Sequence, residues 1–369
     1  MRSAPIIALT VLLGVGCASR PQQTTVPRQV RAQTAEARIA FAAALARMKA
    51  DECDRAVTSF DRVVETFPAS RYVSASLYNA GLCLQRLERW QESTERYERL
   101  LRLRPGSADT KHTRFQLAFL YVETHRFDDA LETTDLLLGH TGLTSDERSE
   151  VMARRAEAWL GRGDLDAAAT EAREALLYYR TRSEEERIRD PFFVASANYT
   201  LAETVRLKSE SIVIPQAKVE AQREVLERRA GLLLEAQRTY FDTIRMTDAY
   251  WASAAGYRIG SMYDAFWDAI MMAPAPPPKR TMTVEELAIY TEEYRLRLAE
   301  LAQPLIRHAI RFWELTLRMV QRTGVRSEWN GRIEGDLERA RARLRKFAGL
   351  GNEASVAVAR NPKRLPQSD

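Results

Sequence analysis

The side chains that most often catalyse reactions or bind metals are few and widely separated in this chain. Its histidines are His112, His125, His140 and His308, and the closest two are thirteen residues apart. That spacing corresponds to about 20 Å along a helix, which is too far for a shared metal ion. The sequence contains no HExxH, GxSxG or phosphate-binding glycine loop, and Glu184 to Glu186 form a solvated charged run. We therefore expect no catalytic residue, metal site, cofactor or small-molecule substrate.

The composition indicates a helical protein with a sizeable core. Sixteen glycines and fourteen prolines in 369 residues are fewer than turn-rich β-folds use. Hydrophobic residues make up 45% of the chain and charged residues 28%, which is too apolar for a disordered chain and too charged for a protein with many membrane spans. The 55 basic and 50 acidic side chains are interspersed, so we expect no nucleic-acid partner.

Residues 1–16 have the pattern of a secretory signal peptide, with Arg2 before the apolar stretch Ile6–Val15. This stretch is too short to span a bilayer, which needs about 20 apolar residues. Residues 17–35 contain two prolines and no apolar period. We expect them to form a flexible tether between the signal and the folded body.

The segment Leu13-Gly14-Val15-Gly16-Cys17 resembles the lipobox of bacterial lipoproteins, although Gly14 stands where the family prefers leucine. The resemblance implies that Cys17 is lipidated and becomes the first residue of the mature protein. Ala18 after the cysteine resembles an outer-membrane sorting signal of the enteric type. The alternative is ordinary signal cleavage after Ala18, which would give a secreted protein without a lipid.

The sequence repeats itself at offsets of 37, 37 and 38 residues. The small residues Gly81, Ala118 and Ala156 share one register, and each is followed three residues later by a large one. This pattern resembles the helix-turn-helix unit of tetratricopeptide repeats, in which small residues let two helices approach closely. The resemblance covers residues 36–182 as four repeats. It implies an all-α solenoid of antiparallel helix pairs with a concave surface for partner proteins.

Residues 183–349 form a divergent half with longer helices. Val219, Leu226, Leu233 and Tyr240 recur every seven residues, which predicts a helix of about eight turns packed like a member of a bundle. A second long apolar pattern begins at the capping box of Thr283 and Glu286, and we expect it to break or kink at Pro304. Residues 350–369 are expected to be a disordered tail.

Two further cysteines, Cys53 and Cys83, could form a disulfide. In an exported, oxidising compartment an even pair of cysteines favours a disulfide. The repeat register places Cys53 at the start of one second helix and Cys83 near the end of the next first helix, which are neighbours in a tetratricopeptide stack. The alternative is that both are small buried apolar residues that never meet.

The concave surface of such repeats is lined by the first helices, and aromatic and arginine side chains there are typical anchors for partners. The alternative is that these side chains pack against adjacent helices. The candidate groove residues in this register are Phe41, Tyr78, Gln85, Phe115, Phe119, Arg154, Tyr199, Arg206, Tyr257 and Arg258.

Together these features predict an outer-membrane-anchored periplasmic scaffold that binds other cell-envelope proteins. The lipidated start, the tether and the repeats resemble lipoproteins of outer-membrane β-barrel assembly and of pilus or secretin assembly. Residues 183–349 are not covered by that resemblance. Two alternatives therefore stay open, a component of a trans-envelope motility or secretion machine and a non-catalytic activator of a peptidoglycan enzyme.

Overall fold

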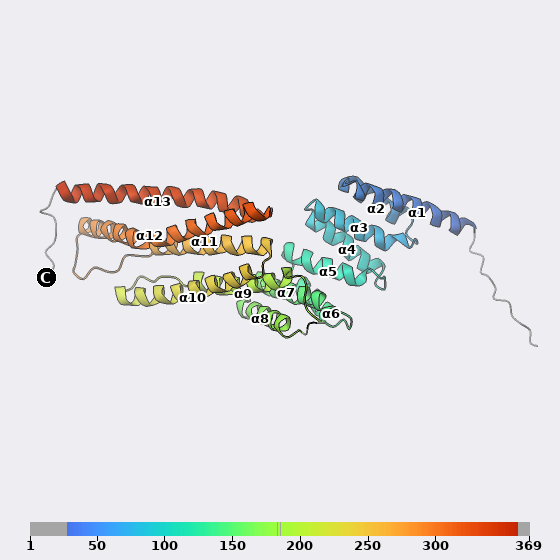
Figure 1. Ribbon diagram of the computed structural model, residues 1–369, viewed down its shortest axis with the longest axis horizontal. Helices are drawn as coiled ribbons and strands as arrows, with labels where there is room; N and C mark the ends of the chain where they lie inside the picture. The colour runs from blue at the N-terminus through green and yellow to red at the C-terminus, as the bar shows by residue number, and fades with distance from the viewer. Residues whose placement is uncertain (1–27, 183, 185, 361–369) are drawn as a thin grey trace, which may run out of the picture.

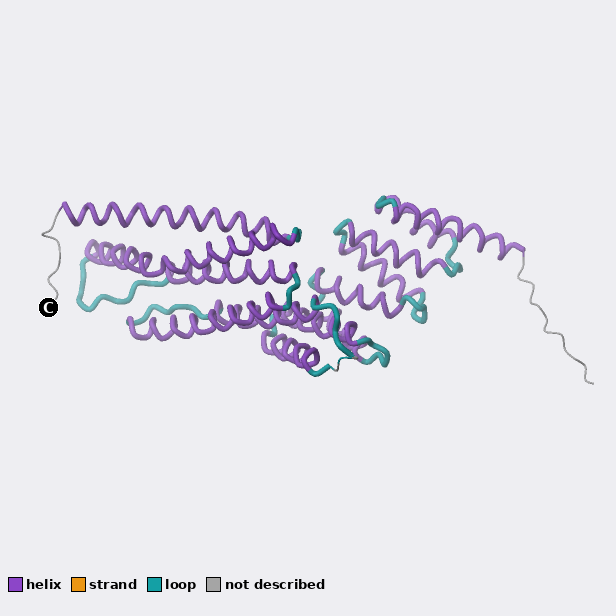
Figure 2. The backbone as a smooth tube through the Cα atoms, in the orientation of Figure 1, coloured by secondary structure: helices purple, strands orange, loops and turns teal. Residues whose placement is uncertain are grey.

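The computed structural model describes residues 28–182, 184 and 186–360. This part of the chain consists of α-helices and their connections, without a strand (Figure 2). The helices are α1 Arg28–Lys49, α2 Cys53–Thr66, α3 Tyr72–Arg86, α4 Trp90–Leu103, α5 Thr110–Glu123, α6 Phe127–Leu138, α7 Ser145–Arg162, α8 Leu165–Arg180, α9 Phe192–Glu210, α10 Val219–Arg245, α11 Ala249–Met272, α12 Val284–Thr323 and α13 Glu328–Arg360. The sequence prediction of an all-α solenoid is confirmed. The signal peptide, Cys17 and residues 361–369 lie outside the described residues.

Two helix boundaries differ from the segments expected from the sequence. Helix α1 begins at Arg28, inside the stretch 17–35 for which we expected a flexible tether. Helix α13 continues to Arg360 and so includes the first eleven residues of the stretch 350–369 for which we expected disorder. Both extensions contain alanine and long charged side chains, which favour helix, and neither contains a proline.

Helices α1 to α8 form four antiparallel pairs that follow one another along the chain (Figure 1). The small residues of the repeat register lie where helices approach most closely. In the second repeat Gly81 faces the ring of Tyr97 so closely that a Cβ atom would overlap it. In the same repeat the Ser93 hydroxyl donates a hydrogen bond of 2.9 Å to the Gly81 carbonyl. Ala118 and Ala156 are buried in the equivalent positions.

The turn between the two helices of each repeat contains one residue in the left-handed region. These residues are Asp51, Glu88, His125 and Gly163, with φ values of 60°, 57°, 58° and 88°. Only one of the four is glycine, the residue that adopts this conformation without steric cost. The packing of the two helices in each repeat, and not the residue type alone, therefore holds the turn in this conformation.

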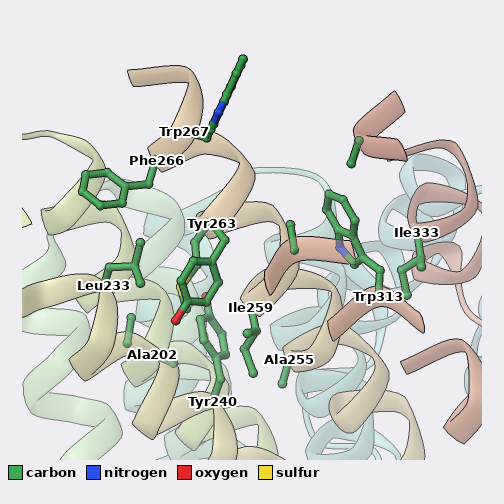
Figure 3. Close-up of a cluster of buried hydrophobic side chains, with 14 of the residues drawn as sticks. Ala202, Leu233, Tyr240, Ala255, Ile259, Tyr263, Phe266, Trp267, Trp313 and Ile333 are labelled. Atoms are coloured by element: carbon green, nitrogen blue, oxygen red, sulfur yellow. The ribbon is translucent and has the colours of Figure 1, made fainter. Parts of the chain in front are cut away.

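Helices α9 to α13 form an elongated bundle in which α11 contacts α9, α10, α12 and α13 (Figure 1). Helix α10 runs from Val219 to Arg245, as the seven-residue apolar period predicts. Its buried side chains Leu233 and Tyr240 join Ile259, Trp267 and Trp313 in one continuous core (Figure 3). Gly260 gives Trp313 room to pack against α11, because a Cβ atom there would overlap the indole ring.

Helix α12 runs unbroken through Pro304, so of the two outcomes expected at that residue the break is wrong, while the kink stays a prediction. Proline removes one helical hydrogen bond and crowds the preceding turn. On either side of it, Ala302 and Ile306 are buried in the bundle core, which holds the helix together. The capping box of Thr283 and Glu286 is present at the start of α12, as predicted.

Candidate partner-binding surface

All ten candidate groove residues lie on the first helices α1, α3, α5, α7, α9 and α11. In α1, Phe41 stacks on Tyr72 with ring centroids 5.1 Å apart. In α3, Tyr78 meets Tyr97 edge to face at 5.5 Å. Burial raises the pKa of the Tyr78 hydroxyl. These half-buried rings both pack on their own chain and leave part of their surface to solvent.

Gln85 links two repeats. Its side-chain amide donates hydrogen bonds of 3.2 Å to the Tyr97 hydroxyl and 2.9 Å to the Gln116 side-chain oxygen on α5. Within the described residues no group donates to the Gln85 side-chain oxygen, so this oxygen is left to accept a bond from another molecule.

Arg154 lies between two aromatic rings in the middle of the array. Its guanidinium carbon is 4.9 Å from the centre of the Phe119 ring and 5.2 Å from that of Phe193. Its Nη1 also pairs with the Glu157 carboxylate at 3.0 Å. The arginine thus joins α5, α7 and α9 through cation–π contacts and one ion pair.

Two carboxylates near Arg154 carry no ion pair within the part of the chain that the structure describes. These are Glu123 on α5 and Glu150 on α7. Desolvation raises the pKa of both carboxyl groups, and the nearby Arg154 offsets only part of that increase. The carboxylates of Glu157 on α7 and Glu328 at the start of α13 raise the pKa of Glu123 further.

Arg206 and Arg258 take part in a buried network centred on Glu203. The Glu203 side chain is 5% exposed, accepts a hydrogen bond from Arg206 Nη2 at 2.6 Å and forms an ion pair with Arg258, whose Nε lies 3.1 Å away. The Tyr240 hydroxyl donates to the same carboxylate. Arg258 Nε also donates to the Tyr199 hydroxyl at 3.1 Å. A buried charge is tolerated when it is paired in this way, so the network connects α9, α10 and α11.

Sequence analysis missed Glu203 and Tyr240 as members of this network. Tyr240 is recognisable from the sequence only as part of an apolar stripe, and nothing in the local pattern marks Glu203 as buried. Burial and the Glu203 carboxylate together raise the pKa of Tyr240, which keeps its hydroxyl protonated and donating.

Three candidate groove residues are mostly buried. Phe115 and Tyr199 are each 8% exposed and Arg206 is 9% exposed, because neighbouring helices cover them. For these residues the structure favours the alternative of packing against adjacent helices. Tyr257 is half-buried and stacks obliquely on Trp329 at 5.3 Å. Partner contact by Tyr257 and by the other half-buried candidates stays a prediction.

Cys53 and Cys83 meet, as the repeat register predicts, but both are free thiols in this structure. They lie in the buried cluster that joins α1, α2 and α3 and are close enough to interact with each other. Burial, followed by that interaction, raises the pKa of Cys83 to about 12. A thiol with so high a pKa is a weak nucleophile at neutral pH, and the disulfide stays a prediction.

Among the described residues, no helix combines the length and apolarity needed to cross a membrane. Within the same residues, no group of three or more histidine, cysteine or acidic side chains is arranged to hold a metal ion.

Comparison with known proteins identifies the repeats. A tetratricopeptide repeat model matches residues 32–70, and a second one matches residues 72–133. A tetratricopeptide repeat protein from Parabacteroides merdae is 15% identical, with a TM-score of 0.39 over 82% of this chain and 98% of that chain. MamA from Desulfovibrio magneticus RS-1 is 12% identical, with a TM-score of 0.37 over 55% of this chain and 96% of that chain.

No curated protein matches the chain. The comparisons indicate no enzyme family, and tetratricopeptide folds typically serve as non-catalytic scaffolds for protein interactions. This chain therefore contains tetratricopeptide repeats, built into an all-α solenoid.

Proposed function

We propose that this protein is an outer-membrane-anchored periplasmic scaffold that mediates protein–protein interactions in an envelope assembly. The observation that carries the scaffold role is the presence of tetratricopeptide repeats whose first helices keep half-exposed aromatic and arginine side chains. Tyr78, Phe119 and Arg154 each combine contacts within the chain with partial exposure to solvent. Such residues are favoured at the centre of protein interfaces.

The anchoring part of the proposal depends on the sequence alone. The lipobox-like segment that ends at Cys17 supports lipidation, and several acyl chains hold a protein on a membrane more stably than one. Cys17→Ala should move the protein from the membrane fraction to the supernatant after cell lysis. Cys53→Ala is the matched control and should leave fractionation unchanged. Membrane retention of Cys17→Ala would overturn the lipid anchor.

The same compartment would oxidise the remaining cysteines. We propose that Cys53 and Cys83 lose two electrons and two protons to a disulfide-bearing thiol oxidase and form one disulfide. Protein isolated from the envelope and denatured should then resist thiol alkylation until a reductant is added. Alkylation of the unreduced, denatured chain at both residues would overturn this pairing.

Crosslinking in cells tests the scaffold role directly. A photoreactive amino acid at Tyr78 or Phe119 should trap a defined envelope protein, while the same amino acid at the exposed Glu65 on α2 should not. Recovery of β-barrel assembly or pilus-assembly components would support the resemblance described above. Motor, secretion or peptidoglycan-enzyme partners would point to the alternative envelope roles. Absence of crosslinks from the first helices would overturn partner binding through this surface.

A further inference from the structure

A hollow lies on the side of α6 that faces away from its buried residues. It has a volume of about 730 Å³ and is formed by α6 together with the last turn of α7. The α6 residues that border it, among them Glu132 and Leu136, lie on the side of the helix opposite the buried Ala130 and Thr134. We call this site the α6 hollow and define it by Asp128, Glu132, Asp135, Leu136, Trp159 and Arg162.

The α6 hollow offers apolar surface that the chain itself does not cover. Leu136 is 53% exposed and borders the hollow together with Trp159. Trp159 is half-buried, and the Arg162 guanidinium lies over its ring at 5.3 Å. A partner side chain placed here would remove both apolar groups from water, at about 25 cal/mol per Å² of apolar surface.

The charge around this apolar surface is negative. Asp128 pairs with Arg162 at 3.0 Å, and Asp135 pairs with Arg155 at 2.8 Å. Glu132 has no ion pair in the described part of the chain. Two of the three carboxylates are thus paired with arginines, and the uncompensated negative charge is that of Glu132, which disfavours phosphate-bearing ligands, such as nucleic acids or lipid head groups, and favours a cation.

We propose that the α6 hollow binds a short segment of a partner protein in which lysine or arginine lies next to large apolar residues. The partner cation would pair with Glu132, and its apolar neighbour would cover Leu136 and Trp159. A partner arginine could stack on Trp159 as Arg162 does, which combines charge complementarity with a cation–π contact. The inference rests on the scaffold role proposed above and specifies a second face and the chemistry of its partner.

Fluorescence anisotropy with the purified full-length protein tests this site. The probes are a fluorescein-labelled peptide of alternating lysine and leucine residues and its counterpart of alternating glutamate and leucine. The lysine peptide should bind at least about tenfold more tightly than the glutamate peptide, and Glu132→Lys and Leu136→Ser should each weaken it by about tenfold. Equal binding of the two peptides would overturn the proposal.

Matched controls separate the α6 hollow from general surface charge. Glu65→Lys on α2 makes the same charge change at an exposed residue, and Leu177→Ser on α8 removes a comparable exposed leucine. Both controls should bind the lysine peptide as the wild type does. Equal weakening by Glu65→Lys and Glu132→Lys would overturn the proposal, because it would show that only net charge matters.

Crosslinking locates the bound peptide and distinguishes this proposal from the scaffold role itself. A lysine–leucine peptide that carries benzophenone should attach to α6 or to the end of α7, as mapped by mass spectrometry of the digested protein. Attachment elsewhere would overturn the α6 hollow as the binding site. If partners are still trapped from Tyr78 or Phe119 in cells, the scaffold role stands even when the α6 hollow fails.

Discussion

The repeats and the bundle bury their apolar side chains in two different arrangements. Helices α1 to α8 bury their apolar side chains in several small clusters, each shared by neighbouring helices. Helices α9 to α13 bury most of theirs in one large cluster to which all five helices contribute, while Val194 and Ala197 of α9 join a separate cluster with α7 and α8. A repeat array gains stability from nearest-neighbour contacts, whereas a single core couples all its helices. A destabilising substitution should therefore affect more helices in the bundle than in the repeats.

The largest effect is expected from Trp313→Ala in the bundle core. Trp313 is fully buried and its indole Nε1 donates to the Tyr257 carbonyl at 3.1 Å. The cavity should lower the free energy of unfolding by about 3–5 kcal/mol. Hydrogen exchange should accelerate throughout α9 to α13 while α1 to α4 keep their protection. Equal loss of protection in α1 to α4 would show that the two regions unfold as one unit.

Removal of the buried carboxylate should have a comparable effect. Glu203→Ala leaves Arg206 and Arg258 without their shared partner, and breaking a buried ion pair in this way costs about 3–5 kcal/mol. In the repeats, Asp61→Ala breaks the more exposed pair with Arg96 and should cost at most about 1 kcal/mol. Denaturant unfolding of both variants measures the difference. A larger loss for Asp61→Ala would reverse the comparison.

A smaller loss is expected from Gly260→Ala. The added methyl group overlaps the Trp313 ring, and overpacking of this kind costs about 1–3 kcal/mol. Gly231 on α10 is exposed and has open space around it, so Gly231→Ala is the matched control. It should raise stability by about 0.5–1 kcal/mol, because alanine is the better helix former. Thermal unfolding should therefore shift in opposite directions for the two variants.

Replacing a turn residue in the left-handed region by glycine should raise the stability of each region. His125 in the repeats has φ 58°, and Thr247 between α10 and α11 has φ 63°. Glycine adopts this conformation without the steric cost of about 1–2 kcal/mol that other residues have, but it loses more conformational entropy on folding. His125→Gly should therefore raise the free energy of unfolding by up to about 1 kcal/mol. Thr247→Gly should gain more, since a β-branched residue is least suited to this conformation. Lower melting temperatures for both variants would contradict this expectation.

The smallest effect concerns pH. Because the pKa of Glu150 is raised in the folded state, ionisation of this carboxyl group opposes folding above that pKa. The opposing contribution disappears as the pH falls below the ordinary glutamate value of 4.5, where both states are protonated. Glu150→Gln should therefore raise the melting temperature at pH 7 more than at pH 4. An equal change at both pH values would show that the carboxylate is not destabilising.

Much of the fold follows directly from the sequence. The recurrence of Gly81, Ala118 and Ala156 gives the register of the repeats, since only small residues permit such close helix contacts. The heptad that ends at Tyr240 gives the extent of α10. The same register brings Cys53 and Cys83 together across two neighbouring helices. These features are local or periodic, so the chain order alone is enough to find them.

The tertiary structure alone decided which polar and aromatic side chains remain accessible. Phe115 and Tyr78 share one repeat position, yet Phe115 is buried and Tyr78 is half-exposed, because exposure depends on how neighbouring helices cover each residue. The burial of Glu203 and the α6 hollow arise from contacts between segments far apart in sequence or from surface left uncovered by packing. The sequence by itself thus determined the repeats and their register, while the packing of helices determined the surfaces that partners can reach.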